Sequence, residues 1–230
     1  MKFLSILIVF LPAAMHSQEE FADAQKLYNA GQYAKAKILF EKEVNDHPNH
    51  LQGIEYLGDI NSRLKHWGEA MSYYQKLKSA KPNSANYQYK YGGALAMLAQ
   101  SSNKLHALTM IDDIESAFLQ AIESDPNHID AHWALIEYYL QLPGIFGGSE
   151  RKATLYANAL SKISPVDGYL AKGRIAEYFK RYTIAESCYK KAIAIGNSKT
   201  TSQKLADLYK NKLHQPDKAK KVMDAFASKG

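Results

Sequence analysis

One pattern of ring-bearing, small and proline residues occurs twice, about 34 residues apart, and this period limits the possible folds more than any other feature. The first copy comprises Tyr33, Ala36, Phe40 and Pro48, and the second comprises Trp67, Ala70, Tyr74 and Pro82. A chain that repeats small, aromatic and helix-breaking residues at this period builds the same helix–turn–helix unit twice. The period therefore predicts stacked helical hairpins that share one elongated core.

The residue types follow from how two antiparallel helices pack in one hairpin. Ala24 and Ala36 supply the small residues that a close helix crossing needs, while rings such as Phe40 fill the space between hairpins. Gly58 lies inside a predicted helix, where glycine costs about 1 kcal/mol relative to alanine. We expect a neighbouring helix to need the space that Gly58 leaves, and Gly92 repeats this requirement one period later.

Apolar spacing extends the pattern to about six hairpins. The first hairpin comprises predicted helices over Phe21–Asn29 and Tyr33–Asn45, and the third comprises helices over Asn86–Gln100 and Leu105–Glu123. The third hairpin is longer than the period, with the surplus around Ser101–Met110. This surplus indicates either a lengthened helix pair or an extra turn at the rim of a groove.

The fourth hairpin contains a proline- and glycine-rich turn over Pro143–Ser149, with Ser149 as the predicted N-cap of the next helix. Gly144, Gly147 and Gly148 suit a tight turn, and a phosphate-binding loop before a helix is the alternative. The fifth and sixth hairpins are predicted over residues 166–197 and 198–230.

These residues resemble the tetratricopeptide repeat, which pairs a small residue in its first helix with alanine, an aromatic residue and alanine in its second, followed by proline. The resemblance covers most of residues 18–230. It implies an all-α, right-handed superhelix of about six helix–turn–helix repeats, whose first helices line a concave groove. Residues 125–153 also look like a subset of exported bacterial members with a proline–glycine-rich turn between the two helices.

Assigning the helix positions of the family's repeat to this sequence predicts which side chains face the groove. The candidates are Gln52, Glu55, Asp59, Arg63, Asn86, Tyr89, Lys90, Trp133, Glu137, Gln141 and Arg174. Mixed charge with exposed rings suits an extended peptide, whose backbone needs donors and acceptors. The family's carboxylate-clamp pattern is not reproduced, which argues against binding of a C-terminal carboxylate. The alternative is that these residues form only a solvated surface.

Few residues are candidates for a catalytic or metal-binding site. His128 and His132 share a helix face with Asp130 between them, which could contribute to a zinc site, but a turn residue and a core ring explain them better. Cys188, the only cysteine, falls in an apolar-periodic helix and is expected to be a small buried side chain. No serine, histidine and acid form a recognisable motif. We therefore expect no catalytic residue, metal or cofactor.

Residues 1–17 have the layout of a secretory signal peptide. Lys2 precedes the apolar run Phe3–Leu11, which is too short to span a bilayer, and cleavage is expected after Ser17. An uncleaved signal anchor is the alternative. This layout predicts an exported protein, periplasmic or secreted, with a repeat domain over residues 18–230 and no membrane span after cleavage.

The formal net charge of +6 is spread among mixed charges, and no motif supports nucleic-acid binding. The function that we expect is a non-catalytic scaffold that binds a protein or peptide segment in its groove. A receptor for a small molecule or a cell-wall glycan, using aromatic residues near Pro143–Ser149, is the second hypothesis. A metal or hydrolytic enzyme that uses His128 and His132 is the third.

Overall fold

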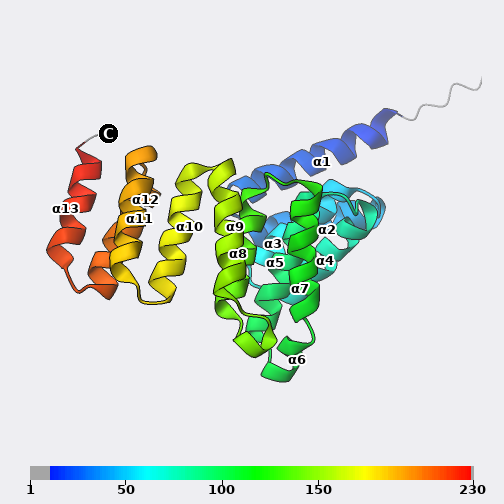
Figure 1. The fold of residues 1–230 in the computed structure, drawn as a ribbon. Coiled ribbons are helices and arrows are strands. Elements are labelled where there is room, and N and C mark those ends of the chain that lie inside the picture. Colours follow the sequence, from blue (N-terminus) through cyan, green and yellow to red (C-terminus); the bar gives the residue numbers. More distant parts are fainter. Residues whose placement is uncertain (1–10, 229–230) are drawn as a thin grey trace, which may run out of the picture. The chain divides into compact units, whose positions relative to one another are not determined.

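The computed structural model describes the backbone of residues 11–228 and the side chains of residues 18–228, and every regular element in these ranges is helical (Figure 1). The chain divides into two compact units, Met1–Met110 and Ile111–Gly230, which are described separately. No helix among the described residues is long and apolar enough to cross a membrane. The all-α expectation is confirmed for this part of the chain.

In unit 1, from residue 11 onward, each helix packs against the next along the chain. The helices are α1 (Leu11–Asn29), α2 (Tyr33–Asp46), α3 (Leu51–Arg63), α4 (Trp67–Ala80), α5 (Ala85–Ser101) and the short α6 (Lys104–Leu108). Helix α1 begins well before the predicted Phe21. Most of the predicted signal peptide, residues 1–10, lies outside the described residues.

Unit 2 repeats the hairpin arrangement through residue 227. Its elements are α7 (Ile111–Ser124), α8 (Ile129–Gln141), the 3-10 helix η1 (Gly144–Phe146), α9 (Glu150–Ile163), α10 (Pro165–Tyr178), α11 (Tyr182–Ile195), α12 (Lys199–Asp207), the π-helical η2 (Leu208–Lys212) and α13 (Pro216–Ala227). Helix α10 packs against both α9 and α11, so successive hairpins share a continuous interface. The predicted bounds of the fifth and sixth hairpins agree with these elements.

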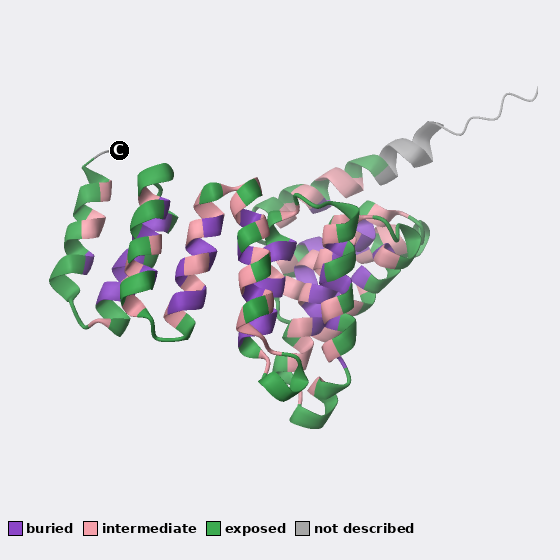
Figure 2. Ribbon diagram, in the orientation of Figure 1, coloured by how far each residue is buried: buried purple, intermediate pink, exposed green. Residues whose placement is uncertain are grey.

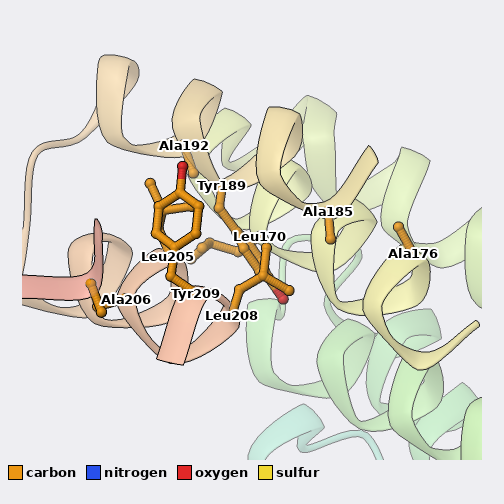
Figure 3. Packing of buried hydrophobic residues seen from close by; sticks show 10 residues of the cluster. Leu170, Ala176, Ala185, Tyr189, Ala192, Leu205, Ala206, Leu208 and Tyr209 are labelled. Carbon is orange, nitrogen blue, oxygen red and sulfur yellow. The ribbon is translucent and has the colours of Figure 1, made fainter. Parts of the chain in front are cut away.

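Small residues and rings occupy the places in the core that the repeat predicts. In unit 1, Ala24, Ala36 and Phe40 are fully buried. The Phe40 ring stacks on Tyr56, with 4.5 Å between ring centroids, and meets the edge of Phe21 at 5.4 Å. In unit 2, buried residues of α10, α11, α12 and η2 form one cluster (Figure 3). Burial follows the inward-facing stripes of the helices (Figure 2).

The expectation for Gly58 is confirmed, because a Cβ atom there would lie 2.5 Å from Cε1 of Tyr74. Unit 2 contains the same arrangement, in which a Cβ atom at Gly173 would lie 2.3 Å from Cε1 of Tyr189. In both pairs the tyrosine belongs to the second helix of the hairpin and follows the glycine at the same spacing along the chain. The glycine thus makes room for a ring that fixes the distance between the two helices.

The prediction of one helix over Leu105–Glu123 is wrong. Residues 104–108 form α6 and a separate helix, α7, begins at Ile111, so the extra residues do not lengthen a helix pair. Asn103 caps α6 by accepting from the His106 N–H, and the Thr109 hydroxyl donates to the His106 carbonyl oxygen. Asp112 and Asp113 in the first turn of α7 favour a new N-terminus, because acidic side chains there interact well with the helix dipole.

The turn of the fourth hairpin has the tight geometry that its glycines allow. Gly147 has φ +99°, and a Cβ atom at Gly148 would lie 1.8 Å from the Leu142 carbonyl oxygen. Ser149 is the N-cap of α9, as predicted, and its hydroxyl accepts from the Lys152 N–H. The turn is therefore held by its own backbone and by the cap.

Candidate functional site

Successive first helices of the hairpins in unit 1 are joined by charged side chains on one face. Lys90 of α5 reaches back to α3, where its Nζ lies 2.6 Å from Glu55 Oε1 and 2.7 Å from Asp59 Oδ1. Asn86 Nδ2 also donates to Glu55, at 3.3 Å. Burial lowers the pKa of Lys90, but the hydrogen bonds to Asp59 and Glu55 outweigh burial and raise it above its usual value. Lys90 is therefore charged at neutral pH.

Arg63, at the end of α3, is exposed and lies against rings of the first hairpin. Its Nε donates to the Tyr28 hydroxyl at 3.1 Å, and its guanidinium lies over the Tyr28 and Tyr33 rings, 5.5 and 5.4 Å from their centroids. Such cation–π contacts contribute about 0.5–1 kcal/mol at exposed sites. Arg63 thus extends the polar face of α3 toward α1.

Unit 2 contains an equivalent link between α8 and α10. Arg174 donates to both carboxylate oxygens of Glu137, at 2.7 and 2.9 Å, in the two-pronged geometry that makes such pairs strong. Gln141 donates to the same carboxylate at 3.2 Å. Trp133 Nε1 donates to Asp167 Oδ1 at 3.0 Å. Two hydrogen-bonded pairs therefore join successive first helices.

Eight of the eleven predicted groove residues thus fall into two clusters, one in each unit. Glu55, Asp59, Asn86 and Lys90 come together in unit 1, and Trp133, Glu137, Gln141 and Arg174 come together in unit 2. Gln52 is exposed on α3, and Tyr89 is half-buried on α5. The expectation of an exposed ring is wrong for Trp133, whose indole packs partly buried against the core of unit 2.

Sequence reasoning missed Asp167 and Tyr87 as members of these clusters. Asp167 lies 34 residues after Trp133, near the start of the next first helix, and meets it directly. Tyr87 donates its hydroxyl to Glu55 at 3.3 Å. The stacking of hairpins could have indicated the region of Asp167, because residues about one repeat apart lie on adjacent hairpins.

A further polar cluster at the start of α9 was not predicted. Glu115 of α7 accepts from the Tyr139 hydroxyl of α8 and from Lys152 Nζ of α9. Burial raises the pKa of Glu115, but these hydrogen bonds outweigh burial and hold it below its usual value. The Lys152 ammonium lies 4.7 Å from the centroid of the Tyr139 ring. The cluster ties three helices together, which suits a structural role.

The two histidines are engaged by their own turn. His128 is the N-cap of α8, where Nδ1 accepts from the Ala131 N–H, and His132 is buried with Nε2 3.0 Å from the Pro126 carbonyl oxygen. Within the described residues, no three histidine, cysteine or acidic side chains are grouped to hold a metal ion. Cys188 is only partly buried, and burial raises the pKa of its thiol.

Comparison with known proteins agrees with the repeat pattern. A tetratricopeptide repeat family model matches residues 166–195, which contain most of α10 and all of α11. A search among curated proteins found no match.

Similar solved structures extend the agreement to most of the chain. A tetratricopeptide repeat protein from Parabacteroides merdae has a TM-score of 0.67 and 14% identity, covering 92% of this chain and 79% of its own. PilW, a type IV pilus biogenesis factor, has a TM-score of 0.65 and 16% identity, covering 92% of each chain. YrrB has a TM-score of 0.55 and 16% identity, covering 79% of this chain and 87% of its own. One repeat of this chain is thus matched by the tetratricopeptide repeat family model, and most of the chain has the fold of tetratricopeptide repeat proteins.

Proposed function

We propose that this protein is a non-catalytic scaffold that binds an extended segment of another protein on the face formed by the first helices of the hairpins within each unit. The observation that carries the proposal is the set of hydrogen bonds and ion pairs between successive first helices, Glu55 and Asp59 with Lys90 and Glu137 with Arg174. Side chains that are already ordered lose less entropy when a ligand binds. These contacts therefore prepare a surface for binding.

The chemistry of this face suits a peptide backbone. Exposed amides at Gln52, Asn86 and Gln141 can donate and accept hydrogen bonds along an extended chain. The carboxylates of Glu55 and Glu137 keep acceptor capacity beyond their contacts in the protein. The similar structure YrrB is described as having an unusual peptide-binding site, which agrees with a peptide ligand for this fold.

A library of immobilised peptides of random sequence, followed by fluorescence anisotropy with the tightest binder, tests this proposal. Exchanging Gln52 and Asn86 together for alanine is expected to weaken binding by about tenfold, because two polar contacts of about 0.5–1.5 kcal/mol each are lost. Both side chains are exposed, so the fold should be unaffected.

Ser72 and Gln75 provide the matched control, because both are exposed polar residues on the second helix α4. The double alanine variant at these positions should bind the peptide as tightly as the wild type. Equal losses in the two double variants, or a library without any binder, would contradict binding on the face of the first helices.

We also propose that the chain is exported and that cleavage follows Ser17. Contacts in the described part of α1 begin close after this point, where Lys42 Nζ lies 2.6 Å from Glu20 Oε2 and Phe21 meets Phe40. Removal of residues 1–17 would therefore leave these contacts in place.

Expression in a bacterial host with mass spectrometry of the fractionated protein checks this prediction. The expected result is a periplasmic or secreted protein whose first residue is Gln18. A cytoplasmic protein that still carries Met1–Ser17 would contradict export.

A further inference from the structure

Three turns of unit 2, each joining the first helix of a hairpin to its second, lie at one end of the unit (Figure 1). Arg181, the N-cap of α11, is paired with Glu150, the first residue of α9, through two contacts of 2.7 Å. Tyr209 of η2 donates to Glu186 in the second turn of α11, at 2.8 Å. We call residues 143–152, 178–184 and 208–215 the turn edge.

Large apolar side chains are exposed on the turn edge. Ile145 is 86% exposed, the Tyr178 and Phe179 rings meet edge to face at 5.1 Å between centroids, and both rings are exposed. Phe146 and Ile184 are exposed as well. Figure 2 shows these turns as mostly exposed. A single exposed apolar residue is ordinary. Several in adjacent turns indicate a surface that an apolar partner covers.

The charge of the turn edge is positive. Arg151, Lys180, Lys210 and Lys212 are exposed there, and the one acidic residue of these three turns, Glu150, is already paired with Arg181. The turns at the other end of the unit have a different character. They carry Asp125, Asp130 and Asp167 together with Lys162 and Lys199, so positive charge is not in excess there. The excess of positive charge therefore coincides with the exposed apolar side chains.

We propose that the turn edge docks on a lipid bilayer that contains anionic headgroups. Exposed apolar side chains flanked by lysine and arginine are the pattern of interfacial membrane binding, in which apolar groups enter the acyl boundary and basic groups pair with phosphates. Long basic side chains can lie along the bilayer surface while their stems cover apolar area. Ile145, at the tip of the turn between α8 and α9, is the side chain that inserts.

The emission of a tryptophan placed in the turn, taken as the difference from the wild type with its native Trp67 and Trp133, reports on insertion at this position. This difference matters because the apolar residues 3–11 of the full chain could bind lipid by themselves. Ile145→Trp is compared with Ile195→Trp, whose site is 51% exposed at the opposite end of α11. The probes are vesicles of phosphatidylglycerol and phosphatidylcholine with brominated acyl chains. We expect a blue shift and quenching for Ile145→Trp only, and equal responses of the two variants, or none, would overturn the proposal.

The basic residues are tested in the Ile145→Trp background. Lys180→Glu with Lys210→Glu should weaken binding of the turn to these vesicles by about tenfold or more, since each basic side chain contributes to attraction by an anionic surface. Lys162→Glu with Lys199→Glu changes the net charge equally at the opposite end and should leave that binding unchanged.

A protein interface would give a different result. If the turn edge joins two copies of this chain, Ile145→Trp emission would shift without vesicles. Sedimentation would then show a dimer that Phe179→Ser dissociates. That outcome would replace the lipid proposal.

Discussion

Replacing Gly58 by alanine is expected to lower the free energy of unfolding of unit 1 by about 2 kcal/mol. The new Cβ atom would lie 2.5 Å from Cε1 and 2.9 Å from Cδ1 of Tyr74. The Tyr74 ring is buried, and its hydroxyl donates to Asp59 at 2.7 Å, so the ring cannot withdraw without losing that bond. The cost exceeds the gain in helix propensity of about 1 kcal/mol. Urea unfolding followed by circular dichroism measures the difference.

Gly93→Ala is the matched control, because Gly93 also lies inside a first helix of unit 1 and a Cβ atom there meets no heavy atom within 4 Å. This variant should be more stable than the wild type by up to about 1 kcal/mol. Tyr74→Leu should remove much of the penalty at Gly58, as a double-mutant cycle would reveal. Equal effects of the two glycine substitutions would show that the ring does not determine the requirement for glycine.

Replacing Phe40 by alanine is expected to cost about 3–5 kcal/mol, the range for removing a fully buried aromatic side chain. The ring contacts Phe21 of α1 and Tyr56 of α3, so its loss leaves a cavity where three helices meet. Denaturant unfolding should show a lower midpoint with little change in slope, provided that unit 1 still unfolds cooperatively.

Ile38 lies on the same helix as Phe40 and is 66% exposed, so Ile38→Ala serves as the control. Its effect should stay within about 0.5 kcal/mol, as for surface substitutions in general. A similar loss for both variants would mean that Phe40 does not occupy the core contact that its burial indicates.

The sequence predicted correctly those features that depend only on residues close together along the chain. Ser149 was predicted as an N-cap because a short polar side chain before a helix satisfies a free N–H group, and it does so in the structure. The helix expected over Leu105–Glu123 failed because apolar spacing continues through Thr109–Met110 although the backbone turns there. Apolar periodicity does not register the Asn103 cap that begins α6 or the hydrogen bond from the Thr109 hydroxyl at its end.

In the candidate site, Trp133 shows what could not be predicted from the sequence. The register placed it on the correct helix, but the adjacent hairpin decides that its indole is partly buried and bonded to Asp167. Whether a side chain is exposed depends on the distance between hairpins. The residue pattern within one hairpin does not predict this distance.

From its sequence alone, this protein is a stack of helical hairpins, because the small residues, rings and breakers that a hairpin needs recur at a constant interval. Only the tertiary structure determines which charged side chains form ion pairs and which turns lie together. The partners Glu55 and Lys90 lie 35 residues apart, and Glu137 and Arg174 lie 37 residues apart. Such contacts, and the exposed apolar turn edge, arise only when one hairpin is stacked on the next.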